Sequence, residues 1–371
     1  MKKYIRGSLA IAALVFLSGW GDTGHTMISY RVNMSFNEEM GFFDNWVFYL
    51  SEHASDPDIR KKDDPEEGPK HYIDIDNYDS FKSGGSIPST LDSCIMLYGD
   101  DFVGQNGYLP WATKTSYDSL VACLTRGDYA SAKQFAADMG HYVADGHMPF
   151  HLTRNYDGQF TGNKGIHARY EIEMIARYKN DITYTGTPAG KVDDVQNYIF
   201  EYIYGNYPYV DSLIMADDYA YEIGNGNTSE QYYMALWEKT ADMTTLFFQK
   251  ASNAFAELLY AAWIEAGKPV SDGTSSADQL KMQKKYNAAI TIFPNPASAI
   301  TTIRAMVPRD VNTTASVYNG AGIKSISLKP NRLATDTREY IMDTSSMENG
   351  IYYFVLRSDH ELQSSPIIVC N

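Results

Sequence analysis

The stretch "GHYVADGHMPFHLTRNYDGQFTGNKGIHARYE", residues 140–171, carries four of the eight histidines of the chain. A carboxylate comes four residues after two of them, because Asp145 follows His141 and Glu171 follows His167. Residues four apart share one face of an α-helix, so each pair is expected to project from one side of a helix. The spacing predicts two helices joined by a glycine-rich loop.

The same stretch predicts a metal site. Pro149 should break or bend the first helix, and His151 follows it as a fifth ligand. Neutral imidazole and carboxylate together suit zinc or a similar divalent ion. A single pair would more often be a surface ion pair of about 0.2–0.5 kcal/mol, but two pairs with a further histidine favour the metal. His147 is not expected to be a direct ligand.

Apolar periodicity predicts the fold class. Tyr117, Leu120, Val121 and Leu124 recur at helical spacing, residues 195–203 repeat the pattern, and residues 229–266 continue it behind an N-cap at Ser229. Residues 268–286 are polar and read as a linker. Residues 287–371 hold short β-branched and aromatic runs between turn residues. We expect an all-α domain over residues 20–267 and a small all-β sandwich after the linker.

The amino-terminal residues have the pattern of a secretory signal peptide. Basic residues precede an apolar run from Leu9 to Leu17, and small residues close it at residue 19. A transmembrane anchor is the alternative, which the short run disfavours. Removal of residues 1–19 would leave Trp20 first, with His25 five residues on. A buried terminal amine and its carbonyl could chelate a metal.

Composition limits the partners of the protein. The 371 residues are 44% apolar and 13% aromatic, enough for a large core and two domains. The net charge of −15 argues against a broad basic surface for nucleic acid, although bound metal ions could supply local positive charge. Cys94 and Cys123 could form a disulfide with Cys370 left over, but sequence does not decide the pairing.

Six motifs together resemble a known enzyme family. They are "WGDTGH" (20–25), "HASDPDIRK" (53–61), "HYIDID" (71–76), "GYLPW" (107–111), "GHYVADGHMPFH" (140–151) and "GIHARYE" (165–171). The motifs and their order resemble those of the zinc-dependent single-strand nucleases of fungi, plants and bacteria. That family and the bacterial zinc-dependent phospholipase C enzymes share an all-α fold that holds three zinc ions. The resemblance covers residues 20 to about 266.

The resemblance implies three zinc ions and their ligands. The first ion would take His71, His141, Asp145 and an aspartate of "SDPD", either Asp56 or Asp58, of which Asp56 is preferred. The second would take Trp20 through its amine and carbonyl, His25, and Asp145 as a bridge. The third would take His151, His167 and Glu171.

The resemblance also implies catalytic and substrate-binding residues. Bridging Asp145 would act in catalysis, and Arg60 would balance charge on the phosphate oxygens, although an ordinary surface role for Arg60 is an equal alternative. Tyr72 and Asp74 match positions at which the nucleases stack and hydrogen-bond a base. Core packing is the alternative for Tyr72.

The carboxyl-terminal residues resemble a sorting domain. "FPNPAS" (293–298), "VYNGAG" (317–322) and "NGIYYFVL" (349–356) occur as in the sorting domains of proteins exported by the type IX secretion system. This implies that the chain is secreted or held at the cell surface, with that secretion machinery as a partner and no stable protein partner otherwise. An immunoglobulin-like adhesion module is the alternative.

We therefore expect an exported zinc-dependent phosphodiesterase. A single-strand-preferring endonuclease acting on DNA or RNA is favoured, and the resemblance also allows 3′-nucleotidase activity. The spacing of Trp20 and His25 is the nuclease pattern, whereas Glu171 and the short loop before His167 look like phospholipase C, so a phospholipid substrate is the first alternative. The second is a cell-surface binding protein with closed, structural zinc sites.

Overall fold

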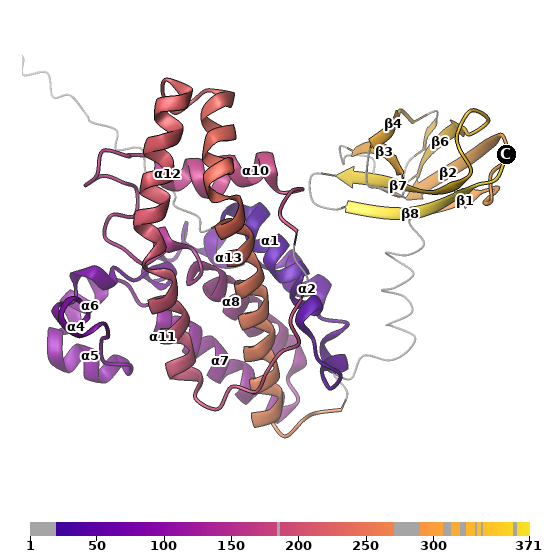
Figure 1. Cartoon of the computed structure of the whole chain (residues 1–371). Coiled ribbons are helices and arrows are strands. Elements are labelled where there is room, and N and C mark those ends of the chain that lie inside the picture. Colours follow the sequence, from indigo (N-terminus) through magenta and orange to yellow (C-terminus); the bar gives the residue numbers. More distant parts are fainter. Residues whose placement is uncertain are drawn as a thin grey trace, which may run out of the picture. The chain divides into compact units, whose positions relative to one another are not determined.

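The structure is a computed structural model that describes residues 20–183, 186–270, 290–306, 313–319, 324–330, 332–334, 337–358 and 362–371. The predicted signal peptide (1–19) and all but the first three residues of the predicted linker (268–286) lie outside the described residues. The chain divides into two compact units between residues 273 and 274, and each is treated by itself below. Figure 1 shows the helical unit and the β unit along the chain.

The first unit is helical, as predicted (Figure 1). Its α-helices are α1 (Gly21–Tyr30), α2 (Val47–Glu52), α3 (Asp56–Arg60), α4 (Asp79–Gly84), α5 (Leu91–Tyr98), α6 (Asp100–Gln105), α7 (Leu109–Arg126), α8 (Tyr129–Asp145), α9 (Ile166–Ala168), α10 (Ile175–Tyr178), α11 (Val195–Asn206), α12 (Tyr209–Gly224) and α13 (Glu230–Glu265). The 3₁₀-helices are η1 (Val32–Ser35), η2 (Met40–Phe43), η3 (Gly68–His71), η4 (Ile75–Asn77) and η5 (Pro149–His151), and η6 (Arg169–Met174) is a π-helix.

The three helices expected from periodicity are confirmed as α7, α11 and α13. The hydroxyl of Ser229 accepts a hydrogen bond from Tyr232 N at 3.2 Å, so it is the N-cap of α13. Beyond the end of α13, Gly267 adopts a left-handed conformation (φ 86°) that ends helices. The capping signals therefore set the bounds of the longest helix.

Helix α8 separates two apolar clusters of the helical unit. Val143 belongs to the cluster formed with α7 and the carboxyl-terminal part of α13. Ala144, one residue on, belongs to a second cluster with Trp20 and Phe248. A Cβ at Gly140 would lie 2.5 Å from the ring of Phe255, so glycine allows α8 and α13 to approach closely. The helix that carries two predicted ligands is thus packed from both sides.

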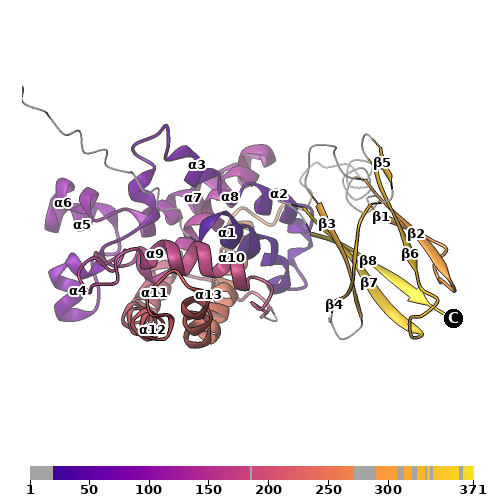
Figure 2. The ribbon, with the colours of Figure 1, turned by 90° about the horizontal axis from the view of Figure 1, so that it is seen from above.

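The second unit is an all-β sandwich, as predicted. It consists of two antiparallel four-stranded sheets, with strand orders β1-β2-β6-β5 and β4-β3-β7-β8. Figure 2 labels the strands of both sheets. The strands are β1 (Ile290–Phe293), β2 (Ile300–Met306), β3 (Thr313–Asn319), β4 (Lys324–Leu328), β5 (Arg332–Ala334), β6 (Thr337–Asp343), β7 (Gly350–Ser358) and β8 (Leu362–Val369). Inward residues such as Val317 and Phe354 pair in register between β3 and β7 and form the core.

The disulfide considered between Cys94 and Cys123 is not present. Cys94 and Cys123 are buried free thiols in α5 and α7, and Cys370 is an exposed one. Burial raises the pKa of the Cys94 thiol to about 11, so the group behaves as a small apolar side chain. Among the described helices, none combines the length and apolar character that crossing a membrane requires.

Candidate metal centre

Helix α8 projects His141 and Asp145 to the same side, and both are fully buried. The helix begins at its N-cap Asp128, whose carboxylate accepts from Ser131 N at 3.2 Å. It ends at Asp145, four residues before Pro149. The imidazole Nε2 of His141 lies 3.2 Å from Oδ2 of Asp145.

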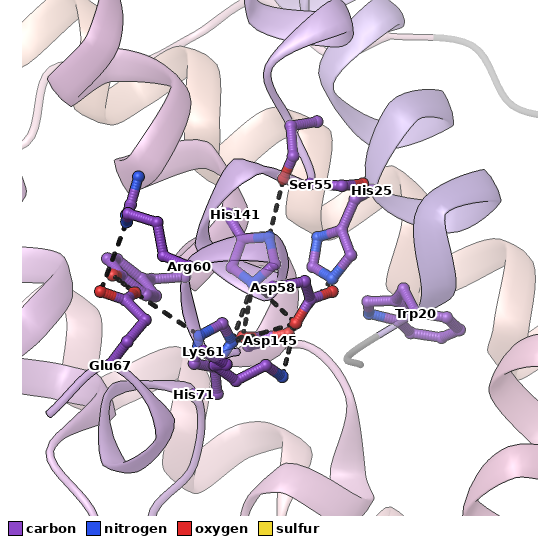
Figure 3. A network of polar contacts seen from close by, with 12 residues as sticks. Trp20, His25, Ser55, Asp58, Arg60, Lys61, Glu67, His71, His141 and Asp145 are labelled. Atoms are coloured by element: carbon purple, nitrogen blue, oxygen red, sulfur yellow. Dashed lines mark hydrogen bonds and ion pairs between the residues drawn. The ribbon is translucent and has the colours of Figure 1, made fainter. Parts of the chain in front are cut away.

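Asp145 gathers histidines from distant parts of the chain. Its Oδ1 lies 3.4 Å from His25 Nε2 on α1, and its Oδ2 lies 3.0 Å from His71 Nδ1 on η3 (Figure 3). The rings of His25 and His141 stack with their centroids 3.9 Å apart. Two groups of potential ligand atoms result, and His141 belongs to both: His25, His141 and Asp145, and Asp58, His71 and His141.

The third group is formed by His151, His167 and Glu171. His167 Nε2 lies 3.0 Å from Glu171 Oε1 and 3.2 Å from His151 Nε2. The predicted second helix differs in geometry, because α9 continues into the π-helix η6, which contains Glu171. Such π-turns are frequent at functional sites.

The donor set fits a divalent cation. His141 and His167 each direct Nδ1 to a backbone carbonyl, of Ala54 at 2.7 Å and of Tyr156 at 2.9 Å. If Nδ1 carries the proton, the Nε2 atoms that face the groups hold lone pairs, the state in which imidazole binds metal. Buried atoms in these groups also lack a hydrogen-bond partner in the described part of the chain: His25 Nδ1 and Nε2, Asp145 Oδ1 and Glu171 Oε1. A shared cation would satisfy them.

The electrostatics keep the carboxylates ionised. Burial by itself would raise the pKa of Asp145, but His141 and His151 outweigh burial and hold that pKa well below its usual range. Burial likewise opposes the charge on His151, yet Asp145 and Glu171 raise the pKa of His151 to about 9. Protons therefore occupy the site in the absence of a cation, and metal binding would displace them.

Trp20 is fully buried. It lies between α8, the helix that carries Asp145, and Glu171 of the third group. Its backbone N–H donates to Glu171 Oε2 at 3.1 Å, and its indole N–H donates to the Ala144 carbonyl at 2.8 Å. The ring of Phe248 contacts the indole edge-on at 4.7 Å between centroids. The indole thus anchors the backbone nitrogen beside Glu171. The grouping of Trp20 with His25 at one ion stays a prediction of the resemblance.

Asp58, rather than the preferred Asp56, lies beside the predicted ligand histidines His71 and His141. Asp58 Oδ1 is 3.6 Å from His71 Nδ1 and 3.8 Å from His141 Nε2. Asp56 turns to His53 instead, with 2.8 Å between His53 Nδ1 and Asp56 Oδ2. The preference for Asp56 is therefore corrected: the two aspartates lie two residues apart on α3, and its short helical turn aims only the second at the group.

Arg60 is engaged by other carboxylates. Its guanidinium donates to both oxygens of Asp138, at 3.1 and 2.9 Å, and lies 3.5 Å from Glu67. The cation in contact with Asp58 is instead Lys61, the neighbour of Arg60, whose Nζ lies 2.5 Å from Asp58 Oδ1. Figure 3 shows Lys61 at the cluster and Arg60 at Glu67. Sequence reasoning did not single out Lys61.

Glu67 is a second residue that sequence reasoning missed. It is 2% exposed, and its Oε1 lies 3.5 Å from His71 Nε2, on the far side of the ring from Asp145. It also accepts from the hydroxyl of Tyr142 and from Lys70. Burial would raise the pKa of Glu67, but His71, Tyr142 and Lys70 outweigh burial and lower it. The signal in the sequence is a glutamate four residues before His71, a predicted ligand.

Tyr72 and Asp74 lie next to His71 in a partly exposed segment. Tyr72 O accepts from Leu109 N at 3.2 Å, and a Cβ at Gly107 would lie 2.1 Å from that oxygen, so glycine permits the contact. Burial, then the carboxylate of Asp76, raises the pKa of Asp74 to about 7. Neither side chain belongs to a potential metal group within the described residues.

His147 stands apart from the three groups. It is 1% exposed, its Nδ1 faces the Val143 carbonyl at 2.8 Å, and its ring stacks on Tyr202 with centroids 4.5 Å apart. The ring is therefore a packed core imidazole rather than a ligand or a solvent-facing group.

Comparison with known proteins identifies the carboxyl-terminal unit. Residues 291–370 match the family described as the secretion system C-terminal sorting domain. The sorting domain indicates that the protein is exported, to be secreted or attached at the cell surface, and implies interaction with the type IX secretion machinery.

Solved structures with likeness to the chain include two clostridial toxins. "Alpha Toxin from Clostridium Absonum" has 10% sequence identity and a TM-score of 0.42, over 95% of both chains. The alpha-toxin of Clostridium perfringens avian strain SWCP has 11% identity and a TM-score of 0.43, over 94% of this chain and 97% of that chain. No curated protein sequence matches the chain.

Replacing His141 tests the shared ligand. Because His141 belongs to two groups, we expect His141→Ala to bind at least one zinc ion fewer per folded chain than the wild type. His147→Ala is the matched control, since it also removes a buried imidazole from the same segment but lies outside the groups. Elemental analysis of both purified variants measures the difference, and equal zinc content in the two would contradict the ligand role.

Replacing Glu67 tests the support of His71. We expect Glu67→Ala to weaken zinc binding about 10- to 100-fold, the range found when the partner of a ligand histidine is removed. Lys70→Ala is the control, because it removes another partner of Glu67 and leaves the carboxylate beside His71. Competition with a chelating indicator reports the affinities. Wild-type affinity in Glu67→Ala would show that His71 is held without it.

Proposed function

We propose that the protein is an exported zinc-dependent phosphodiesterase that cleaves single-stranded nucleic acid. The observation that carries the proposal is the sharing of His141 and Asp145 among converging histidine and carboxylate groups. A purely structural zinc site is usually closed by four protein ligands. The third group, formed by His151, His167 and Glu171, offers only three side chains, which leaves room for water or substrate.

The ligands would be distributed as follows. One ion would be held by Asp58, His71, His141 and Asp145, a second by His25, Asp145 and the amine of Trp20 once residues 1–19 are removed, and the third by His151, His167 and Glu171. Zinc bound there supplies a water of lowered pKa and positive charge for phosphate oxygens. Asp145, held between His25 and His71, keeps two of the groups at a fixed spacing.

Two neighbouring cations, Arg60 at the end of α3 and Lys61 directly after it, have different roles in this proposal. Lys61 lies at the edge of the cluster, and its ammonium can balance charge on the non-bridging phosphate oxygens. Arg60, the residue that the resemblance implies for this role, contacts Asp138 and Glu67 instead. Because Glu67 in turn faces His71, Arg60 would act indirectly, by holding Glu67 beside His71. We assign the electrostatic role to Lys61.

Aromatic side chains near the third group favour nucleic acid over phospholipid. The loop between His151 and His167 carries Phe160, which is 69% exposed, and the guanidinium of Arg154 lies 5.6 Å from the centre of its ring. Tyr156, in the same loop, is 40% exposed. Ring faces beside a cation suit the bases and phosphates of a single strand, whose bases are free to stack. Tyr72 would add a further stacking surface beside His71.

A parallel release assay tests the function. The protein beginning at Trp20 is incubated with zinc and either single-stranded DNA or RNA, or phosphatidylcholine vesicles. Acid-soluble nucleotides that disappear with chelator are the expected result. Diacylglycerol release instead would assign the protein to phospholipid hydrolysis, and inactivity on both substrates would support a structural role for the metals.

Replacing Tyr72 tests base stacking. A stacked base contributes about 1–3 kcal/mol, so we expect Tyr72→Ala to raise KM for single-stranded DNA about 5- to 150-fold with a smaller change in kcat. Tyr72→Phe should retain activity, because the ring face is kept. Tyr221→Ala, at an exposed tyrosine of α12, is a surface control. Unchanged KM in Tyr72→Ala would return Tyr72 to a packing role.

Replacing Asp74 tests its raised pKa. The pKa of about 7 in the folded protein exceeds the unfolded value of about 3.9. The folded state therefore retains the proton over this range, and stability is lost as the pH rises from about 4 to 7. We expect Asp74→Asn to raise the melting temperature more at pH 8 than at pH 5. Thermal unfolding at both pH values measures this, and equal shifts would contradict the raised pKa.

A further inference from the structure

A buried ion pair lies immediately behind the third group. Arg169 of η6 and Asp217 of α12 are 8% and 2% exposed, and Arg169 Nη2 lies 3.0 and 3.2 Å from the two oxygens of Asp217. Arg169 is two residues from His167 and two from Glu171 in the sequence. Neither partner is among the potential ligands.

The remaining donors of the guanidinium fasten the loop that precedes His167. Arg169 Nη1 donates to the Lys164 carbonyl at 2.9 Å, and Nη2 also donates to the Asn163 carbonyl at 3.2 Å. Its Nε donates to the hydroxyl of Tyr232 on α13 at 2.9 Å. Gly165 completes the close approach: its φ is 88°, and a Cβ there would lie 2.7 Å from Nη1.

The loop is also tied to α12 by its own side chain. The amide of Asn163 donates to Asp217 Oδ2 at 2.9 Å and to Asp218 Oδ1 at 2.7 Å. Within the loop, Gly165 N donates to the Asp157 carbonyl at 3.0 Å. The adjacent carbonyl, of Tyr156, is the partner of His167 Nδ1. The network therefore fixes both ends of the loop segment that orients the His167 ring.

General stability alone does not explain this arrangement. A buried ion pair costs the desolvation of two charges, and an apolar pair of similar size is often as stable or more stable. A guanidinium with four partner groups does what an apolar pair could not, because it sets the position of two carbonyls relative to two helices. The ion pair therefore fixes the orientation of the loop that precedes His167.

We propose that Arg169 and Asp217 are positioning residues that hold the loop and η6 so that His151, His167 and Glu171 converge on one metal ion. This inference rests on the proposed function, which makes that group a zinc site. It adds that the third site depends on the α12–α13 pair, which contributes no ligand to it.

The test is a zinc titration of Arg169→Lys and Asp217→Asn in the full mature chain. Lys keeps the charge but offers one nitrogen in place of the planar fork, and Asn keeps the shape of Asp217 without its charge. We expect both variants to bind the third zinc about 10- to 100-fold more weakly, with the other two sites unchanged. The titration step lost in Glu171→Ala identifies the third site.

Leu213→Ala, at a fully buried apolar position of α12, is the control for general destabilisation. It should lower the melting temperature while the third zinc affinity stays at the wild-type value. Two results would overturn this inference and leave the proposed function standing. One is wild-type affinity for the third zinc ion in both Arg169→Lys and Asp217→Asn, and the other is an equal loss of that affinity in Leu213→Ala. A wild-type chain that takes no zinc at this group would contradict the proposed function and this inference with it.

Discussion

The arrangement of the helical unit depends on one buried carboxylate and the imidazoles around it. Asp145 has no exposed surface, and its oxygens lie within 3.7 Å of nitrogen atoms of His25, His71, His141 and His151. Such a cluster is costly to bury unless its charges are balanced. The cluster must therefore bind protons or cations that balance its charge. The packing of the surrounding helices must also offset the cost of removing these groups from water. The elements that supply them are α1, η3, α8 and η5, which come from separate parts of the sequence.

The surroundings act mainly on orientation. Backbone carbonyls of Ala54 and Tyr156 hold the rings of His141 and His167, and Glu67 faces the outer nitrogen of His71. The indole of Trp20 is clamped by aromatic rings from α13, which brings its backbone nitrogen to Glu171. The rings of His71, His141 and His167 are thus each held by a second contact, from Glu67 or from the backbone. That pattern is typical of metal sites in which the partners of the ligands matter nearly as much as the ligands.

Sequence reasoning succeeded where the signal is local. The i,i+4 spacing of His141 and Asp145, the N-cap Ser229 and the alternating runs of the sandwich each reflect a short-range rule, and the structure contains the corresponding elements. It failed where the answer depends on tertiary placement. The sequence around Asp56 and Asp58 does not show which of the two faces His71 of η3; only the folded helix does. Glu67 and Lys61 likewise reach His71 and Asp58 only in the folded chain.

Anomalous diffraction at the zinc absorption edge, from crystals of the protein beginning at Trp20, tests the central claim most directly. The account predicts three peaks: one at Asp58, His71 and His141, one at His25 and Asp145, and one at His151, His167 and Glu171. Clear density for these side chains with no anomalous peak among them, or with a single peak, would contradict it.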